Sequence, residues 1–490
     1  MKAGVVSLLL FLLSCTHGLQ RGKDYFKEKV CNEYNALGET NFRSISIIIN
    51  SRKYSNATFE QIISLVNDML DLAKKCCAAG ADPDCYENES TAFSEKSCSP
   101  DAPFPRHPGI AGCCTQHGLD RKLCLAALKH PPKEFPTYVE PSNEEICDAF
   151  KKDPQGFEER FLADYSSDYS YAPLPILQNS TMNYLSIVRT CCASTQSNIC
   201  FLKERLQQKP VQALTHLSNK ACALDALLGK NKTKVSYLIK FTQQTPSLSF
   251  DNAIALAGEA SEILSKCCTS LEESCFQNEL KPHIAHICNT ACGGNERLRS
   301  CCSSKDDMGK YLCIYSLPWD KPSQDSQAAS SVDEGVCRED GEVDIYRNIY
   351  DMARIYTRAP EALLITLYSA SQAAAANCCG LPDPKACFTE KVSKTIAPLH
   401  ALIEKGNEIC GEYTDHTYVE FLKRLKANAL TLFPPGTLDA EDQASAVVEQ
   451  RTSYVTKCCH LNAPPMYCGI QVKDPIATVC FLVDCIENES

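Results

Sequence analysis

The sequence lacks any apolar run long enough to cross a bilayer. The longest run near its start, from Val5 to Leu13, falls far short of the roughly 20 residues that a membrane-spanning helix needs. G-x-S-x-G, H-E-x-x-H and phosphate-loop motifs are also missing, so nothing indicates an enzyme. The net charge is -11 and the basic residues are dispersed, which argues against nucleic acid or anionic membranes as partners. We expect a protein that neither inserts into membranes nor catalyses a reaction.

Metal ligands at useful spacing are absent as well. No C-x2-C pair occurs among the 32 cysteines, although zinc sites typically need such pairs or Cys/His clusters. His283 and His286 share a helical face, but two histidines without further ligands are more typical of a surface. The sequence therefore predicts no metal site and no cofactor.

The first residues, MKAGVVSLLLFLLSCTHGLQ, have the pattern of a secretory signal peptide. Lys2 precedes the apolar run, and the small residues Thr16 and Gly18 follow at cleavage spacing. We expect residues 1–18 to be removed and the mature chain to be secreted. Disulfides form in the oxidising compartments on that route, so the many cysteines predict a disulfide framework.

The cysteines repeat along the chain with a period of about 190 residues, which is long enough for each copy to hold its own core. The third copy stops early. The first copy comprises Cys31, Cys76, Cys77, Cys85, Cys98, Cys113, Cys114, Cys124, Cys147, Cys191, Cys192 and Cys200. The second comprises Cys222, Cys267, Cys268, Cys275, Cys288, Cys301, Cys302, Cys313, Cys337, Cys378, Cys379 and Cys387. The third comprises Cys410, Cys458, Cys459 and Cys468.

The segments between cysteines have helical periodicity. Apolar residues between Phe59 and Cys77 fall at i, i+3, i+4 and i+7, and Thr58 with Gln61 predicts a capping box at the start. Neighbouring residues on a helix point about 100° apart, so adjacent cysteines suit bridges to two different partners. No series of alternating strands is present. We predict an all-α chain of disulfide-stapled helical domains.

A triplicated helical unit marked by Cys-Cys pairs resembles the serum albumin family. The truncated third unit and four segments resemble one member in particular: CCAAGADPDCY (76–86), RKLCLAALKHPPKEFPTYVEPSNEEICDAF (121–150), CFLKERLQ (200–207) and LNAPPMYC (461–468). The resemblance implies a monomeric plasma carrier of three albumin-like domains. We expect the domains at residues 19–208, 209–394 and 395–490, the last truncated and followed by an atypical tail.

The family pattern also implies the disulfide pairing. In the first copy the bridges should be Cys31–Cys77, Cys76–Cys85, Cys98–Cys114, Cys113–Cys124, Cys147–Cys192 and Cys191–Cys200. The second copy should pair likewise, as Cys222–Cys268, Cys267–Cys275, Cys288–Cys302, Cys301–Cys313, Cys337–Cys379 and Cys378–Cys387. The third should contain Cys410–Cys459 and Cys458–Cys468. Cys292, Cys480 and Cys485 have no place in this pattern, and their odd number leaves at least one free or paired between chains.

The same resemblance implies binding of vitamin D sterols, such as 25-hydroxyvitamin D, in a groove of the first domain. A secosteroid is a long apolar body with a hydroxyl at each end, so it needs an apolar groove with a few fixed polar groups. The apolar wall implied for this chain is Val30, Phe42, Ile45, Ile49, Tyr54, Tyr86 and Phe93. Ser94 and Ser97 would meet one sterol hydroxyl near Leu125. Without the resemblance, these residues would read as ordinary core and capping positions.

One expected contact differs in this chain. Where the family has a tyrosine that bonds the side-chain hydroxyl of the sterol, this sequence has Asn50. An amide can also donate or accept that hydrogen bond. A lost neutral hydrogen bond costs about 0.5 to 1.5 kcal/mol, so we expect binding to be weakened by about tenfold and not abolished.

The resemblance further implies capture of monomeric actin by a clamp of the domains, with the segment matching Lys391 to Glu420 as a principal contact. Lys391, Lys394 and Lys405 are its candidate contacts, although the segment alone reads as an ordinary amphipathic helix with solvated lysines. The alternative function is a general albumin-like carrier of fatty acids and anions. Glycosylation is expected at the sequons of Asn56, Asn88, Asn179 and Asn231.

Overall fold

A computed structural model describes residues 24–99, 104–128, 141–272, 274–293, 295–304, 306–322, 333–338, 341–431, 433, 440–459 and 468. Every regular element within these residues is a helix, so the all-α prediction is confirmed. None of the described helices combines the length and hydrophobicity that a transmembrane segment requires. The predicted signal peptide and the tail with Cys480 and Cys485 lie outside the described residues.

The chain forms two compact units. Unit 1 comprises residues 1–223 and 266–276, and unit 2 comprises residues 224–265 and 277–490. The division into three domains at residues 208 and 394 is finer than these units and stays a prediction.

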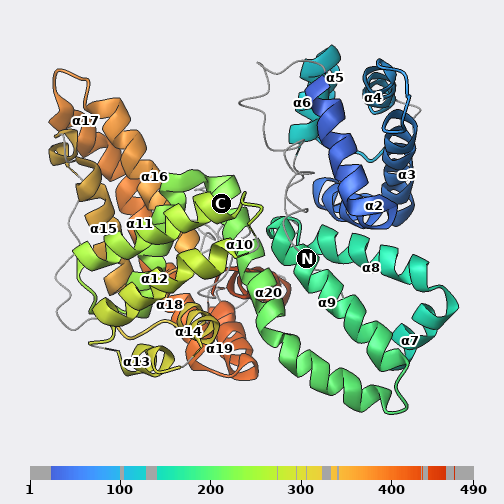
Figure 1. The fold of residues 1–490 in the computed structure, drawn as a ribbon. Helices are drawn as coiled ribbons and strands as arrows, with labels where there is room; N and C mark the ends of the chain where they lie inside the picture. Colours follow the sequence, from blue (N-terminus) through green and yellow to red (C-terminus); the bar gives the residue numbers. More distant parts are fainter. Residues whose placement is uncertain are drawn as a thin grey trace. The chain divides into compact units, whose positions relative to one another are not determined.

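The described helices of unit 1 are drawn in blue to green in Figure 1, apart from short ends of α11 and α12 at residues 266–276. They are α2 (Asp24–Lys53), α3 (Phe59–Cys76), α4 (Cys85–Lys96), α5 (Ile110–Cys114), α6 (Gly118–Ala127), α7 (Asn143–Lys152), α8 (Pro154–Asp168), α9 (Leu174–Cys192) and the start of α10 (Ser197–Gln244).

Unit 2 contains the rest of α10 and most of the next two helices, α11 (Phe250–Cys267) and α12 (Cys275–Ala291). It continues with α13 (Glu296–Cys302), α14 (Asp307–Tyr315), the 3-10 helix η2 (Glu334–Cys337), α15 (Gly341–Ile355), α16 (Glu361–Cys378), α17 (Pro384–Lys391), the π-helix η3 (Val392–Ile396), α18 (Ala397–Asp415), α19 (Tyr418–Thr431) and α20 (Ala440–Cys458).

Local sequence signals set the helix starts and breaks. The capping box predicted at Thr58 and Gln61 is present at the start of α3, so that prediction is confirmed. Gly38 breaks α2 with φ of 72°, and Gly229 breaks α10 with φ of 77°. Each glycine follows the first cysteine of its copy by seven residues, and a positive φ of this kind favours glycine. The repeat therefore extends from the cysteines to the backbone.

Fourteen disulfides join the helices, and they are the pairs that the family pattern implies in all three copies. Adjacent cysteines do bond different partners: Cys76 bridges to Cys85, whereas Cys77 bridges to Cys31. The end of α3 is thus fixed to both α2 and α4. Of the described cysteines, Cys292 alone is unbridged.

The expectation that His283 lies at the surface is wrong. Its side chain is buried, with Nδ1 at 2.8 Å from Glu259 Oε2 and Nε2 at 2.9 Å from the hydroxyl of Tyr315. Burial lowers the pKa of His283 despite the hydrogen bond that its ring makes to the carboxylate of Glu259. The ring is a satisfied core group of unit 2, which helix periodicity alone does not reveal.

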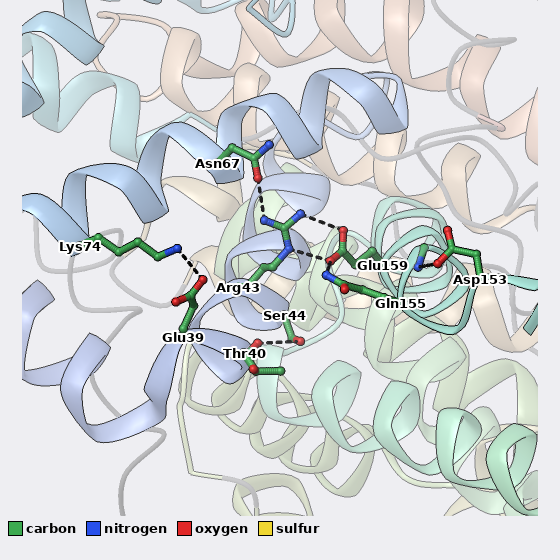
Figure 2. A network of polar contacts seen from close by, with 10 residues as sticks. Glu39, Thr40, Arg43, Ser44, Asn67, Lys74, Asp153, Gln155 and Glu159 are labelled. Carbon is green, nitrogen blue, oxygen red and sulfur yellow. Dashed lines mark hydrogen bonds and ion pairs between the residues drawn. The ribbon is translucent and has the colours of Figure 1, made fainter.

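Helix α2 is the central helix of the unit 1 core. Its apolar residues Phe42, Ile45 and Ile48 are buried with residues of α3, α8 and α9. Figure 2 shows the polar contacts at the edge of this core, where Arg43 donates to both carboxylate oxygens of Glu159 on α8, at 2.7 and 2.9 Å, and to Asn67 on α3. Burial opposes ionisation of Glu159, but the hydrogen bonds from Arg43 and Gln155 and the charge of Arg43 together outweigh it and hold the pKa below its ordinary value. One guanidinium therefore ties α2 to two neighbouring helices.

Replacing Arg43 by methionine should destabilise the packing of α2 against α8 by about 1 to 3 kcal/mol, because a half-buried carboxylate loses its bidentate partner. The measurement is the opening free energy of α2 and α8 by native-state hydrogen exchange at neutral pH. The difference from the unmodified protein should shrink in acid, as pH falls through the lowered pKa of Glu159.

Lys74→Met is the matched control, since the Lys74–Glu39 pair in the same network is exposed on both sides. It should change the opening free energy by less than about 0.5 kcal/mol. Equal effects of the two variants would contradict the assigned role of Arg43.

Candidate functional site

Unit 1 contains a cavity between α2, α3, α4 and α6. The space between its walls is about 1080 Å³, the open mouth included. Most of the wall is apolar, which suits a hydrophobic ligand better than an ionic one. The lining residues are Val30, Glu33, Phe42, Ser46, Ile49, Asn50, Lys53, Tyr54, Leu65, Met69, Leu72, Tyr86, Ser90, Phe93, Ser94, Ser97, Phe104, Lys122, Leu125 and Ala126.

The disulfides hold the walls of this cavity apart at fixed positions. Cys31–Cys77 ties α2 to the end of α3, and Cys76–Cys85 ties α3 to the start of α4. Cys98–Cys114 and Cys113–Cys124 connect the end of α4 through α5 to α6. Each helix of the cavity is therefore covalently restrained near one end, and the wall does not depend on a ligand to keep its geometry.

The aromatic part of the wall is an edge-to-face cluster. The ring of Tyr54 lies 5.7 Å from that of Phe104, and Phe104 lies 5.9 Å from Phe93. Burial raises the pKa of Tyr54 above its ordinary value, so the phenol stays neutral. These rings give the cavity a rigid apolar surface at little cost in conformational entropy.

The sterol-site residues implied by the family resemblance gather at this cavity, with one difference. Val30, Phe42, Ile49, Asn50, Tyr54, Tyr86, Phe93, Ser94, Ser97 and Leu125 all belong to the wall. Ile45 is buried in the core beside them and is not a lining residue. The structure therefore brings these residues together, whereas their part in ligand binding stays a prediction.

Three polar side chains on the wall already use their donor groups within the protein. Ser94 Oγ donates to Thr91 O and Ser97 Oγ to Ser94 O, each at 2.8 Å. Asn50 Nδ2 donates to Ser46 O at 2.8 Å and lies 3.3 Å from Met69 Sδ. The atoms that remain for a ligand are oxygens, namely the serine lone pairs and Asn50 Oδ1. These three side chains are thus set to accept hydrogen bonds from hydroxyl groups.

Two lysines that line the cavity are held by protein partners. Lys53 Nζ donates to the carbonyl of Leu125 at 2.6 Å, and Lys122 Nζ donates at 2.9 Å to both Glu87 Oε1 and Ser90 Oγ. These contacts tie α6 to α2 and α4, so the cations help to hold the wall together.

The family resemblance did not single out Glu33, which also lines the cavity. Its side chain is 3% exposed, and burial raises its pKa to about 7 although Lys29 favours ionisation. From the sequence alone, a glutamate two residues after a cysteine is expected to be exposed to solvent. No sequence signal distinguishes it from the exposed Glu28 on the same helix.

The segment proposed for actin contact lies in unit 2. It runs from the last residue of α17 through η3 and α18 to the start of α19. Lys394 pairs with Glu390 at 2.7 Å and Lys405 with Glu408 at 3.0 Å, in exposed ion pairs. Lys391 is the last residue of α17, next to the π-helix. Val419 at the start of α19 is 77% exposed, which is unusual for a large apolar side chain.

The four glycosylation sequons lie at accessible positions. Asn56, Asn88, Asn179 and Asn231 are each exposed in the structure. Access is necessary for modification, and occupancy stays a prediction.

Comparisons with known proteins agree with the repeat. Residues 29–201 and 220–388 match the model of the serum albumin family, and residues 408–475 match the model of domain III of vitamin D binding protein. The vitamin D-binding protein of Mus musculus is 42% identical over 467 residues, which cover 95% of this chain and 97% of that protein. The vitamin D-binding protein of Homo sapiens is 38% identical over 467 residues, which cover 95% of this chain and 98% of that protein. Albumin of Mesocricetus auratus is 24% identical over 82% of this chain and 67% of its own length.

Proposed function

Because this chain belongs to the serum albumin family, within its vitamin D-binding proteins, we propose that it carries vitamin D sterols in the cavity of unit 1. Family members are carrier proteins and not enzymes. The observation that carries the proposal is the cavity itself: an apolar wall with hydrogen-bond acceptors at fixed positions. A secosteroid supplies an apolar body and terminal hydroxyls, which complement both parts of that wall.

The position of Asn50 supports the proposal that this residue still bonds the side-chain hydroxyl of the sterol, with an amide in place of the family's phenol. Asn50 lies on the wall with Oδ1 left to accept, because its Nδ2 donates to Ser46 O. A shorter side chain stands where the family has a tyrosine, so the ligand hydroxyl must lie deeper or the bond must lengthen. We propose that 25-hydroxyvitamin D binds with a modest loss of affinity and not with loss of binding.

Fourteen disulfides support a secreted plasma protein, since such frameworks persist in oxidising extracellular surroundings. The alternative of a general fatty-acid carrier is less well supported. Fatty acids need a cation for the carboxylate, and the two lysines that line the cavity are engaged by carbonyl, carboxylate and hydroxyl oxygens.

Titration of the purified protein with 25-hydroxyvitamin D, followed by fluorescence or calorimetry, should show saturable binding at one site. Ala126→Trp fills the cavity from α6 and should weaken that binding by at least about tenfold. Ala127→Trp is the matched control, because Ala127 is exposed on the same helix and does not line the cavity. Absence of binding at micromolar sterol, or palmitate displacing the sterol at several sites, would overturn the proposal.

We also propose that the face formed by η3, α18 and the start of α19 contacts monomeric actin. Support comes from the family relationship and from exposure of Tyr418 and Val419, at 49% and 77%, beside charged residues. Large exposed side chains with an apolar body and a polar rim are typical of protein interfaces. A π-helix within the same segment is also more frequent at functional sites than elsewhere.

Val419→Glu should weaken actin binding by at least about tenfold, because a charge would be buried in the interface. The measurement is the shift in critical concentration of actin polymerisation. Val343→Glu introduces the same charge on the exposed surface of α15, outside the segment, and should bind as the unmodified protein does. Equal effects of both variants would exclude this face.

A further inference from the structure

The carboxyl group of Glu33 lines the cavity but has no hydrogen-bond partner for either oxygen among the described residues. Both of its oxygens are buried and make no hydrogen bond within the described part of the chain. The residue lies on α2 and lines the cavity, with 3% of its surface exposed. Burying a carboxyl without a hydrogen-bond partner is costly, and in native proteins such a group calls for an explanation.

The charged and titratable groups around Glu33 do not provide that partner. Lys29, one turn earlier on α2, attracts the carboxylate by its charge, but neither oxygen of Glu33 accepts a hydrogen bond from it. Tyr86 on α4 has its pKa raised by burial, with smaller contributions from Glu87 and Glu33, so its phenol is neutral. The remaining cations, Lys53 on α2 and Lys122 on α6, donate elsewhere. On α3 the lining residues are Leu65, Met69 and Leu72, which carry no charge.

We infer that Glu33 is a specificity-determining residue of the cavity, whose carboxylate accepts a hydrogen bond from a hydroxyl of the bound sterol. This inference rests on the proposed function. A hydroxyl donor is the group that a vitamin D sterol can offer to an acceptor in an apolar wall. A hydrogen bond to an ionised acceptor is about twice as strong as a neutral one, so Glu33 contributes more to selectivity than Ser94, Ser97 or Asn50.

The inferred contact has two consequences. The cavity should prefer a sterol that carries the hydroxyl over one that lacks it, because without that hydroxyl the buried carboxyl remains unpaired. Binding should also favour the ionised carboxylate and lower its pKa. Affinity should therefore decline from about pH 8 to about pH 6, across the pKa of about 7, as Glu33 takes up a proton.

The test compares sterols with variants of Glu33 in the full-length protein. The sterols are 25-hydroxyvitamin D, vitamin D without the side-chain hydroxyl, and an analogue without the ring hydroxyl. Glu33→Leu should weaken the sterol that carries the contacted hydroxyl by at least about tenfold, and should leave the analogue without it unchanged or tighter. Glu33→Gln keeps an acceptor and should restore part of the affinity while abolishing its dependence on pH.

Glu28→Gln is the control, since Glu28 is exposed on the same helix. Equal weakening of all three sterols by Glu33→Leu, or no weakening in a variant with normal helical content, would overturn the inference. So would a pH dependence that survives in Glu33→Gln. If the unmodified protein binds none of the sterols, the proposed function itself fails, which is a distinguishable outcome.

A separate observation concerns Cys292, just beyond the end of α12 in unit 2. Its Sγ lies 3.3 Å from Sγ of Cys302, which is bridged to Cys288. The three sulfur atoms lie within 4.8 Å of one another. Because two of them form a disulfide, they are not available as thiolate ligands for a metal. The geometry is that of a thiol beside a disulfide.

We propose that Cys292 exchanges with the Cys288–Cys302 bridge. The Cys292 thiolate attacks Sγ of Cys302, the Cys292–Cys302 bond forms, and the Cys288–Cys302 bond breaks. Cys288 leaves as a thiolate and takes up a proton to replace the one lost by Cys292, so no external oxidant or reductant is needed. Both isomers tie α13 to the end of α12. Burial raises the pKa of the Cys292 thiol more than Arg299 lowers it, so exchange should accelerate in alkaline solution.

Cys288→Ser should still be secreted and folded, with a Cys292–Cys302 bridge recovered by peptide mapping without reduction. Cys98→Ser is the matched control, because it removes the equivalent bridge of the first copy, Cys98–Cys114. The residue four positions after Cys98 is Ala102, whereas the residue four positions after Cys288 is Cys292. That variant has no substitute thiol and should lose most of its yield. In the unmodified protein, alkylation at alkaline pH should label both Cys288 and Cys292. Label on Cys292 alone, or a bridge from Cys292 to Cys480 or Cys485, would overturn the proposal.

Discussion

The structure depends on a restriction that adjacent cysteines impose on a helix. Two neighbouring side chains point about 100° apart, so they cannot serve the same partner without strain. In α3 this places Cys76 against α4 and Cys77 against α2, and the same arrangement recurs at the ends of α9, α16 and α20. The first pair therefore fixes α3 to two other helices.

The cavity of unit 1 lies among helices that are held by this restraint. Helices α2, α3, α4 and α6 are linked near their ends by disulfides, and Arg43 adds a polar tie from α2 to α8 and α3. Between these ties the helices present rings and branched aliphatic side chains with acceptor oxygens among them. Preorganisation of this kind reduces the ordering cost of binding. The surrounding disulfides also stabilise the fold, so it tolerates one unfavourable buried carboxyl group, that of Glu33, in an apolar wall.

The sequence permitted prediction of features with strong local or periodic signals. The cysteine spacing gave the repeat, the 3.6-residue periodicity gave the helices, and Thr58 with Gln61 gave a cap that the structure contains. The lining residues could be predicted only through the family resemblance, because an isoleucine at helical spacing has the same sequence pattern whether it packs in the core or lines a cavity. Ile45 illustrates that limit: it shares the stripe of Ile49 but faces the core. Glu33 and His283 depend on tertiary burial, and neither Glu nor His carries a local signal that separates a buried position from a solvated one.

The central claim is that a preformed cavity of unit 1 receives a hydroxylated sterol, and hydrogen–deuterium exchange with and without 25-hydroxyvitamin D tests it most directly. The account predicts that saturating sterol protects amides of α2, α3, α4 and α6 and leaves the helices of unit 2 unchanged. Protection centred in unit 2, or unchanged exchange throughout unit 1 at saturating sterol, would contradict it.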